Sequence, residues 1–210
     1  MPSSTKDRRG GRPASGTPGR EQEALATREA LIAAGLELFA ARPYSEVGTE
    51  EIVRRARVTR GALYHHFADK RDLFRAVHER VEEGLVAGIG ARMEGASDPW
   101  EVMVRGTRAF LDACDDPAVK RIALTDAPSV LGWSEWREID ERYGLGLMKA
   151  ALGGAMEAGV IRPAPLEALS HLMLGALAEA AFLIANAEDA PAAREQTEGA
   201  LLELLEGLRS

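Results

Sequence analysis

The sequence has a single cysteine and few aromatic residues. Cys114 has no second cysteine with which to pair, so nothing indicates a secreted fold held together by disulfides. Phe, Trp and Tyr make up 5% of the residues, whereas Ala, Leu, Glu and Arg, which are strong helix formers, are abundant. Because 46% of the residues are hydrophobic, the chain can bury a sizeable core, and its composition favours helices.

Long apolar runs are also missing. The longest run, Leu172 to Ala185, is interrupted by Glu179 and is shorter than the ~20 residues that a membrane span requires. The first residues are polar and basic, unlike a secretory signal, so we expect a cytoplasmic protein. The sequence contains no Gly-rich phosphate loop and no Cys-x-x-Cys, His-Glu-x-x-His or Gly-x-Ser-x-Gly pattern. We therefore expect no catalytic residue, metal or cofactor, and an enzyme is the less favoured alternative.

Positive charge is concentrated at the front of the chain. The net charge of the whole chain is -7, but residues 1–75 carry 14 Lys and Arg against 10 Asp and Glu, a net charge of +4. The remaining residues therefore carry a net charge of -11. A basic front on an acidic body is typical of a protein that touches a polyanion at one end.

Helix-stopping and helix-capping residues divide the chain into helices. Pro43 ends the first helix, and Thr49, Thr59 and Asp69 can each cap the start of another. Residues 1–20 are rich in Gly, Pro, Ser and Arg, which predicts a flexible arm. The expected helices cover about residues 21–42, 49–56, 59–67, 69–94, 99–114, 117–130, 134–158, 165–187 and 191–208.

The sequence therefore predicts an all-α fold of about nine helices. No stretch of useful length alternates between apolar and polar residues as a strand does. The second and third helices are short and separated by a tight turn, with longer helices on either side. This is the layout of a helix-turn-helix.

The helix-turn-helix segment carries a characteristic run of residues. Thr49-Glu-Glu-Ile-Val is followed, after the turn, by Thr59-Arg-Gly-Ala-Leu-Tyr-His-His-Phe-Ala-Asp-Lys. Over about residues 27–75 the chain resembles the tetracycline-repressor (TetR) family. The resemblance implies a DNA-binding regulator whose third helix lies in the major groove, with Thr49, Tyr64 and Lys70 on phosphates.

The side chains of the third helix agree with this implication. Arg60 can donate two hydrogen bonds to a guanine, and Gly61 lets the backbone approach the duplex closely. Ala62 can contact a thymine methyl group. His65 projects toward bases or phosphates, and Tyr64 is suited either to a phosphate or to packing. A sequence-specific regulator, by default a repressor, is the favoured function, and an architectural DNA-binding protein is the alternative.

Two positions depart from the family pattern. Arg57 stands in the turn where relatives usually have Gly, so this residue must tolerate a less favoured backbone conformation. Glu50 stands where some relatives place a base-reading cation. In the arm, Gly11-Arg12-Pro13 resembles the core of an AT-hook, in which Arg12 enters a narrow minor groove, and a solvated tail is the alternative.

The last two expected helices have apolar surfaces that suit a dimer. The helix over 165–187 is apolar on most sides, and the helix over 191–208 carries a row of leucines. The resemblance implies that these helices pair with those of a second copy, so that two recognition helices read a palindrome about one DNA turn apart. An intramolecular core is the alternative.

Large side chains gather in the middle helices, where we expect a small, largely apolar ligand. Its binding would favour one spacing of the two DNA-reading ends and so release DNA. The alternative for each of these residues is an ordinary place in the core. The candidate ligand contacts are Trp100, Met103, Thr107, Phe110, Trp133, Trp136, Tyr143 and His171.

We expect four parts: a basic arm (1–20), a DNA-binding domain (21–68), a connecting helix (69–94) and a ligand-binding and dimerisation domain (95–210).

Overall fold

The computed structural model of the protein describes residues 18–210, and this range contains helices and no β-strand. The prediction of an all-α fold with about nine helices is therefore confirmed. The elements are α1 (Pro18–Ala41), a 3-10 turn η1 (Tyr44–Glu46), α2 (Thr49–Ala56), α3 (Arg60–His66), α4 (Lys70–Met93), α5 (Pro99–Ala113), a π-helical segment η2 (Val119–Asp126), α6 (Ala127–Leu131), α7 (Trp133–Glu157), α8 (Leu166–Ala185) and α9 (Ala190–Glu206).

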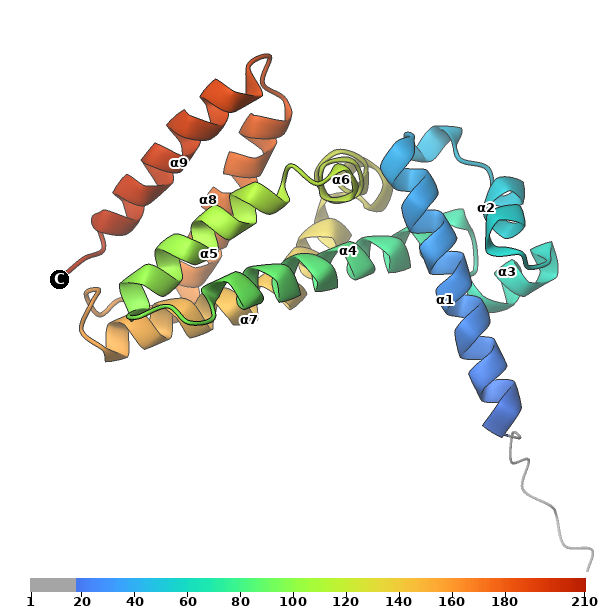
Figure 1. Ribbon diagram of the computed structural model, residues 1–210, viewed down its shortest axis with the longest axis horizontal. Coiled ribbons are helices and arrows are strands. Elements are labelled where there is room, and N and C mark those ends of the chain that lie inside the picture. The colour runs from blue at the N-terminus through green and yellow to red at the C-terminus, as the bar shows by residue number, and fades with distance from the viewer. Residues whose placement is uncertain (1–17) are drawn as a thin grey trace, which may run out of the picture.

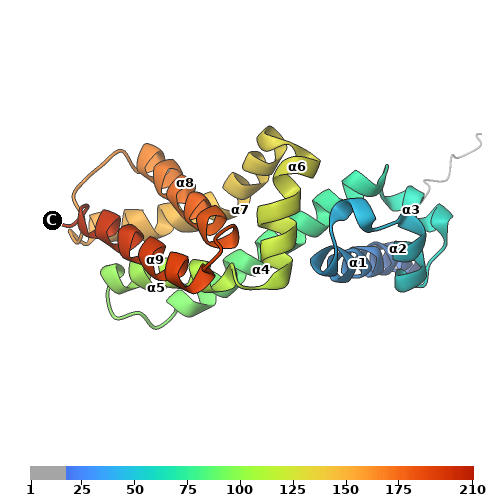
Figure 2. The ribbon, with the colours of Figure 1, turned by 90° about the horizontal axis from the view of Figure 1, so that it is seen from above.

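The molecule is elongated, with its two ends joined by one long helix. Helices α1, α2 and α3 form a compact unit at one end, which we call the head (Figure 1). Helices α5 to α9 form a larger unit, the body, which carries the C-terminus at the opposite end (Figures 1 and 2). Helix α4 packs against α1 in the head and against α5 and α7 in the body. The head is therefore presented away from most of the body.

The head is held together by apolar side chains that recur at helical spacing. Leu31 and Phe39 of α1, Ile52 of α2, Leu63 of α3 and Phe74 of α4 are all fully buried in one core. Because α2 and α3 are too short to be stable in isolation, their conformation depends on this packing. The single buried residue of α3, Leu63, anchors that helix and leaves its other face toward solvent.

The boundaries of the short helices follow from local capping interactions. The Thr59 hydroxyl accepts a hydrogen bond from the Ala62 amide at 3.2 Å, and the Asp69 carboxylate accepts one from the Asp72 amide at 2.8 Å. Both caps were predicted. The expected cap by Thr49 was wrong, because Gly48 occupies the capping position and Thr49 is already the first helical residue.

The turn after α2 adopts the left-handed conformation at Arg57, with φ 56° and ψ 37°. It is the only residue other than glycine with positive φ in the range 18–210. The Val58 amide donates to the Val53 carbonyl at 3.0 Å and the Arg57 amide to the Arg54 carbonyl at 3.2 Å, the pattern of a Schellman turn. The structure thus confirms that Arg57 tolerates a disfavoured backbone.

The head and the body share a continuous core. The cluster of buried residues that includes Leu31 and Phe74 extends through Ile122 of η2 to Trp136 and Ile139 of α7. Segment η2 and helix α6 together cover the range that the sequence predicts as one helix, 117–130, but the first part of that range is wound as a π-helix. Segment η2 packs against α1, α4 and α8, so it lies between the head and the body.

Helix α8 is long and apolar enough to cross a membrane when only length and composition are considered, with a mean hydropathy of 1.7. The sequence predicts this helix over 165–187, and the apolar run 172–185 forms its C-terminal part. The helix packs against α5, α7 and α9 and buries Met173, Leu177 and Ile184 among them. These contacts are those of a core helix in a helical bundle.

The backbone of Arg57 leads to a stability prediction. Arg57→Gly is expected to raise the free energy of unfolding by about 0.5–1 kcal/mol, because relief of the left-handed strain outweighs the added freedom of glycine in the unfolded chain. Urea denaturation measures the difference. Arg54→Gly is the matched control: Arg54 is exposed and lies inside α2, where glycine should lower the stability by about 1 kcal/mol. A loss of stability in Arg57→Gly would contradict the assignment of strain to this turn.

Candidate functional site

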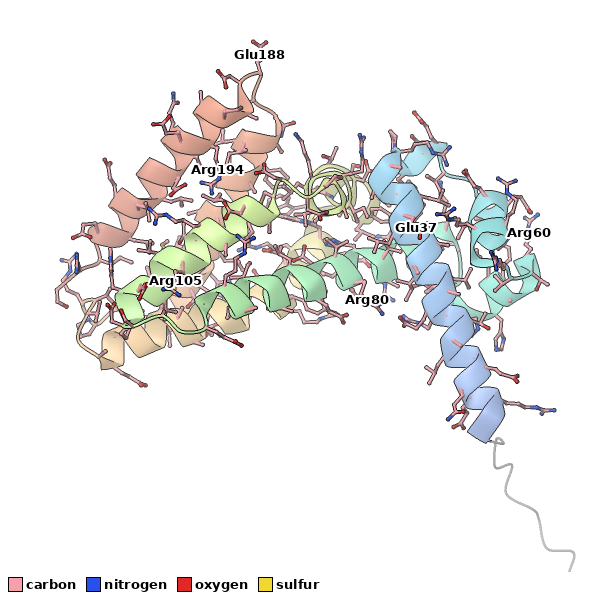
Figure 3. All side chains as sticks on the ribbon, in the orientation of Figure 1. Glu37, Arg60, Arg80, Arg105, Glu188 and Arg194 are labelled. Carbon is pink, nitrogen blue, oxygen red and sulfur yellow. The ribbon has the colours of Figure 1, made fainter. Side chains whose placement is uncertain are left out.

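The outer surface of α3 presents the polar residues that the sequence predicts as DNA contacts. Arg60, Gly61, Tyr64 and His65 are exposed, whereas Ala62 is half-buried. Figure 3 shows Arg60 at the outer end of the head, away from the body. Thr59 and Arg60 lie at the N-terminal end of the helix, where the backbone amides are directed outward. The structure therefore brings together the predicted contacts of α3 on one surface.

Arg60 is paired with an acidic residue of the preceding helix. Its guanidinium lies 3.0 Å from a carboxylate oxygen of Glu50, and both side chains are about two-thirds exposed. The guanidinium also lies over the ring of Tyr64, at 5.6 Å from its centroid. The Tyr64 hydroxyl, followed by the charge of Glu50, raises the pKa of Arg60. The sequence identified Glu50 as unusual but not its partnership with Arg60.

Lys70 is half-buried, and its ammonium group is bound within the head. Its ammonium donates hydrogen bonds to the backbone carbonyls of Tyr44 at 2.9 Å and Val47 at 3.0 Å. The same group lies 3.9 Å from the centroid of the Tyr44 ring. Burial lowers the pKa of Lys70. Two of the three N–H groups of the Lys70 ammonium thus bind the loop between α1 and α2. The phosphate contact expected of Lys70 stays a prediction.

The other predicted DNA contacts fall into two groups. Thr49 is half-buried at the start of α2, and its phosphate contact stays a prediction. Arg12, with the rest of the AT-hook-like motif, lies outside the described residues 18–210. Its minor-groove contact also stays a prediction.

The body contains a second candidate site, a partly open cavity of about 80 Å³. It lies among α4, α5, α7, α8 and α9. Three predicted ligand contacts, Met103, Thr107 and Phe110, line it from α5. The Thr107 hydroxyl donates to the Met103 carbonyl at 3.0 Å, so its bond is already satisfied within the helix. The position of the cavity agrees with the expected ligand site, and its lining is largely apolar, as ligand sites usually are.

The other five predicted ligand contacts lie elsewhere, because their helices turn these side chains away from the cavity. Trp136 is buried in the core shared with the head, and Trp133 is 65% exposed beside it. Trp100 lies under the guanidinium of Arg209. The two remaining side chains contact acidic residues: the Tyr143 hydroxyl donates to Glu83, and the His171 ring lies beside Glu141 and Glu167.

Sequence reasoning missed two acidic residues that line the cavity. Glu82 of α4 and Asp140 of α7 are both largely buried there. Glu82 follows Val81 within the apolar stripe of α4, and this placement of an ionisable residue is the signal that could have indicated it. Burial raises the pKa of Glu82 to about 8 and that of Asp140 to about 6.

Two family models match the chain, one over the body and one over the head. A model of a family described as "Tetracyclin repressor-like, C-terminal domain" matches residues 100–208. A second model, described as "Bacterial regulatory proteins, tetR family", matches residues 31–77. The first match alone spans half of the chain, and it includes most of the body.

Solved structures and curated proteins show the same similarity over most of the chain. A crystal structure of a TetR-family transcriptional regulator from Pectobacterium atrosepticum is 36% identical, with a TM-score of 0.81, and the match covers 90% of this chain and 96% of that one. The Tn10 TetC protein of Escherichia coli is 24% identical over 74% of this chain and 79% of its own. RolR in complex with resorcinol has the same fold, at a TM-score of 0.71, 22% identity, and coverage of 88% of this chain and 90% of that one.

The two hydrogen bonds of Lys70 within the head lead to a second prediction. Lys70→Met should lower the free energy of unfolding in the absence of DNA by about 1–3 kcal/mol, because two carbonyl groups lose a charged donor. Chemical denaturation measures this difference. Lys120→Met is the control, since Lys120 is exposed on η2 and should change the stability by less than about 0.5 kcal/mol. Equal stability of the two variants would show that Lys70 does not hold the head together.

Proposed function

Since the chain belongs to the TetR family of bacterial regulatory proteins and is a helix-turn-helix transcriptional regulator, we propose that it represses transcription from a palindromic operator until a small, largely apolar ligand releases it. The observation that carries this proposal is the surface of α3. A single buried residue, Leu63, fixes that helix on the head, and its polar residues lie together at the outer end of the molecule. A helix presented in this way fits the major groove.

The contacts with DNA follow from the chemistry of the exposed residues. We propose that Arg60 reads a guanine, that Ala62 meets a thymine methyl group, and that His65 reaches a base or phosphate. A methyl group added to Gly61 would have the Thr59 hydroxyl, at 3.8 Å, as its one neighbour within 4 Å among the described residues, so the backbone there is open to the duplex. Thr49, Tyr64, Lys70 and Arg12 are assigned to the DNA backbone and minor groove. Thr59 contributes by setting the start of α3.

A dimer would supply the second recognition helix. We propose that α8 and α9 pair with the same helices of a second copy, because both carry large apolar side chains that the single chain leaves uncovered. Leu172 and Leu183 of α8 are 71% and 55% exposed, and Leu204 of α9 is 56% exposed. Leu172, Glu179 and Leu183 recur at helical spacing and share a face of α8. Covering such a face is favourable in proportion to its apolar area.

Ligand binding would act on DNA through α4. This helix lines the cavity with Glu82 and Ile89 and contributes Phe74 to the core of the head. A ligand that binds one spacing of the two heads more tightly shifts the population toward it and so lowers operator affinity.

The proposed division is an arm (1–20), a DNA-binding domain (21–68), a connecting helix (69–94) and a ligand-binding and dimerisation domain (95–210). A regulator of DNA would act in the cytoplasm.

The first test of this proposal is operator recognition. The purified protein is used to select its preferred duplex from random DNA, and binding is then measured with systematic base substitutions. Arg60→Ala should weaken binding to the preferred duplex by about 1–3 kcal/mol, roughly 10–150-fold, and relax discrimination at one base pair of each half-site. Tyr64→Phe should weaken binding to all sequences alike. Discrimination that is unchanged in Arg60→Ala would remove this residue from the readout.

The second test concerns the dimer. The double variant Leu172→Glu, Leu204→Glu should be monomeric by size-exclusion chromatography with light scattering, because two apolar contacts would be replaced by charges in addition to the Glu179 that this face of α8 already carries. Leu25→Glu is the matched control: Leu25 is 64% exposed but lies on α1, far from the proposed interface, so this variant should remain dimeric. A double variant that still forms dimers would exclude this face of α8 and α9.

A further inference from the structure

The cavity in the body has an adaptable, largely apolar wall. Four of the six methionines in the sequence line it: Met93, Met103, Met148 and Met173. Methionine side chains are flexible and polarisable, so such a wall can adjust to ligands of different shape. The cavity volume is about 80 Å³, whereas an apolar cavity of roughly 150 Å³ holds benzene. Its occupant is therefore compact, and the methionines must move to admit a ring.

The ionisable residues of the cavity wall are both acidic. Glu82 and Asp140 line the cavity, and no Lys, Arg or His of the described residues is among its lining. Asp140 is paired with Arg137, at 3.1 Å. The Glu82 side chain is 8% exposed and accepts no hydrogen bond from residues 18–210; its nearest basic neighbour is the ring of His78, at 3.8 Å. The wall thus contains one largely buried carboxyl group that accepts no hydrogen bond from the described part of the chain and whose oxygens remain accessible from the cavity.

This arrangement determines the charge of a suitable ligand. An anion would be repelled by the Asp140 carboxylate, and by Glu82 once it ionises, and would find no cation among the residues described in the wall. A neutral apolar molecule would leave Glu82 without a partner, at the cost of a buried polar group. A cation with an N–H donor would satisfy this carboxyl group and compensate its charge.

We propose that the cavity binds small lipophilic amines in the ammonium form, with the carboxylate of Glu82 as hydrogen-bond acceptor and counter-ion. The inference rests on the ligand-responsive function proposed above and specifies the ligand class of that site. The ammonium group donates an N–H to a Glu82 carboxylate oxygen, while the alkyl part lies against the methionines. In the empty cavity burial raises the pKa of Glu82 to about 8, so at neutral pH each amine that binds displaces one proton to solvent.

The test uses three probes that share one ring: cyclohexylamine, cyclohexanol and cyclohexanecarboxylate. Titration calorimetry on the full-length protein at pH 8 should show binding of the amine, at least tenfold weaker binding of the alcohol, and none of the carboxylate. Glu82→Gln keeps the size of the side chain and removes its charge, so it should weaken amine binding at least tenfold and alter alcohol binding less than threefold. Glu83→Gln is the control, since Glu83 is the exposed neighbour on the same helix.

The dependence on pH provides a readout that a purely structural role of Glu82 would not give. Amine affinity should rise toward tenfold per pH unit between pH 6 and pH 8, because the Glu82 carboxyl must lose its proton, whereas the amine keeps its own as lysine does. His78 and Cys114, which also adjoin Glu82, have pKa values of about 4 and about 12 and do not titrate in this range. Asp140 titrates near pH 6, so Asp140→Asn should preserve the rise above pH 7.

Each outcome supports or overturns the inference. Amine binding that is lost in Glu82→Gln, retained in Glu83→Gln and weakened at low pH supports it. Equal amine affinity of Glu82→Gln and the original protein, or equal binding of the alcohol or the carboxylate, overturns it. Failure of the proposed function is distinguishable: Glu82-dependent amine binding that leaves operator affinity unchanged refutes ligand-controlled release and leaves the site intact. Operator release by the carboxylate or the alcohol alone refutes the amine site and leaves ligand control intact.

Discussion

The contact on which the rest of the structure depends lies at Tyr44, where the head meets α4 and η2. The Tyr44 ring packs 5.7 Å from that of Phe39 and 5.1 Å from that of Phe74, measured between centroids. Its carbonyl accepts a hydrogen bond from Lys70, and its amide donates one to the Asp126 carboxylate at 2.9 Å. A single turn of backbone is therefore held from α4 on one side and from η2 on the other. Movement of either element would therefore displace the loop that precedes α2.

Helix α4 makes the same connection on a larger scale. At about 1.5 Å per residue, its 24 residues span roughly 36 Å. Phe74 lies in the aromatic cluster of the head, and Glu82 and Ile89 lie at the cavity wall. The Arg71 guanidinium, in the first turn, donates to the Leu131 carbonyl at 2.8 Å and so ties this end to α6. An element that reaches from the core of the head to the cavity wall offers a contiguous path by which the two ends can be coupled.

The sequence predicted the head better than the site residues of the body, because the information lies at different distances along the chain. The starts of α3 and α4 depend on Thr59 and Asp69, which cap amides three residues away. The position of the Lys70 ammonium depends on carbonyl groups 23 and 26 residues away, which no local pattern indicates. Similarly, the rotation of α7 about its axis decides that Asp140, and not Trp136, faces the cavity. That rotation is fixed by packing against α4 and α8.

In the ion pair between Glu50 and Arg60, the Glu50 carboxylate competes with DNA for the Arg60 guanidinium. When a cationic side chain binds a phosphate, the small cations condensed on the DNA are released into solution, and this release drives association. Here the neutralising carboxylate is tethered, so it gains no translational freedom when it is displaced, and it stays near the phosphates as an uncompensated negative charge. If Arg60 reads a guanine as proposed, a duplex that offers only phosphates does not return the free energy spent on opening the pair, whereas a guanine offers Arg60 two hydrogen-bond acceptors. Under the proposed readout, the pair would therefore lower affinity for wrong sites more than for the operator and shorten the time spent on them.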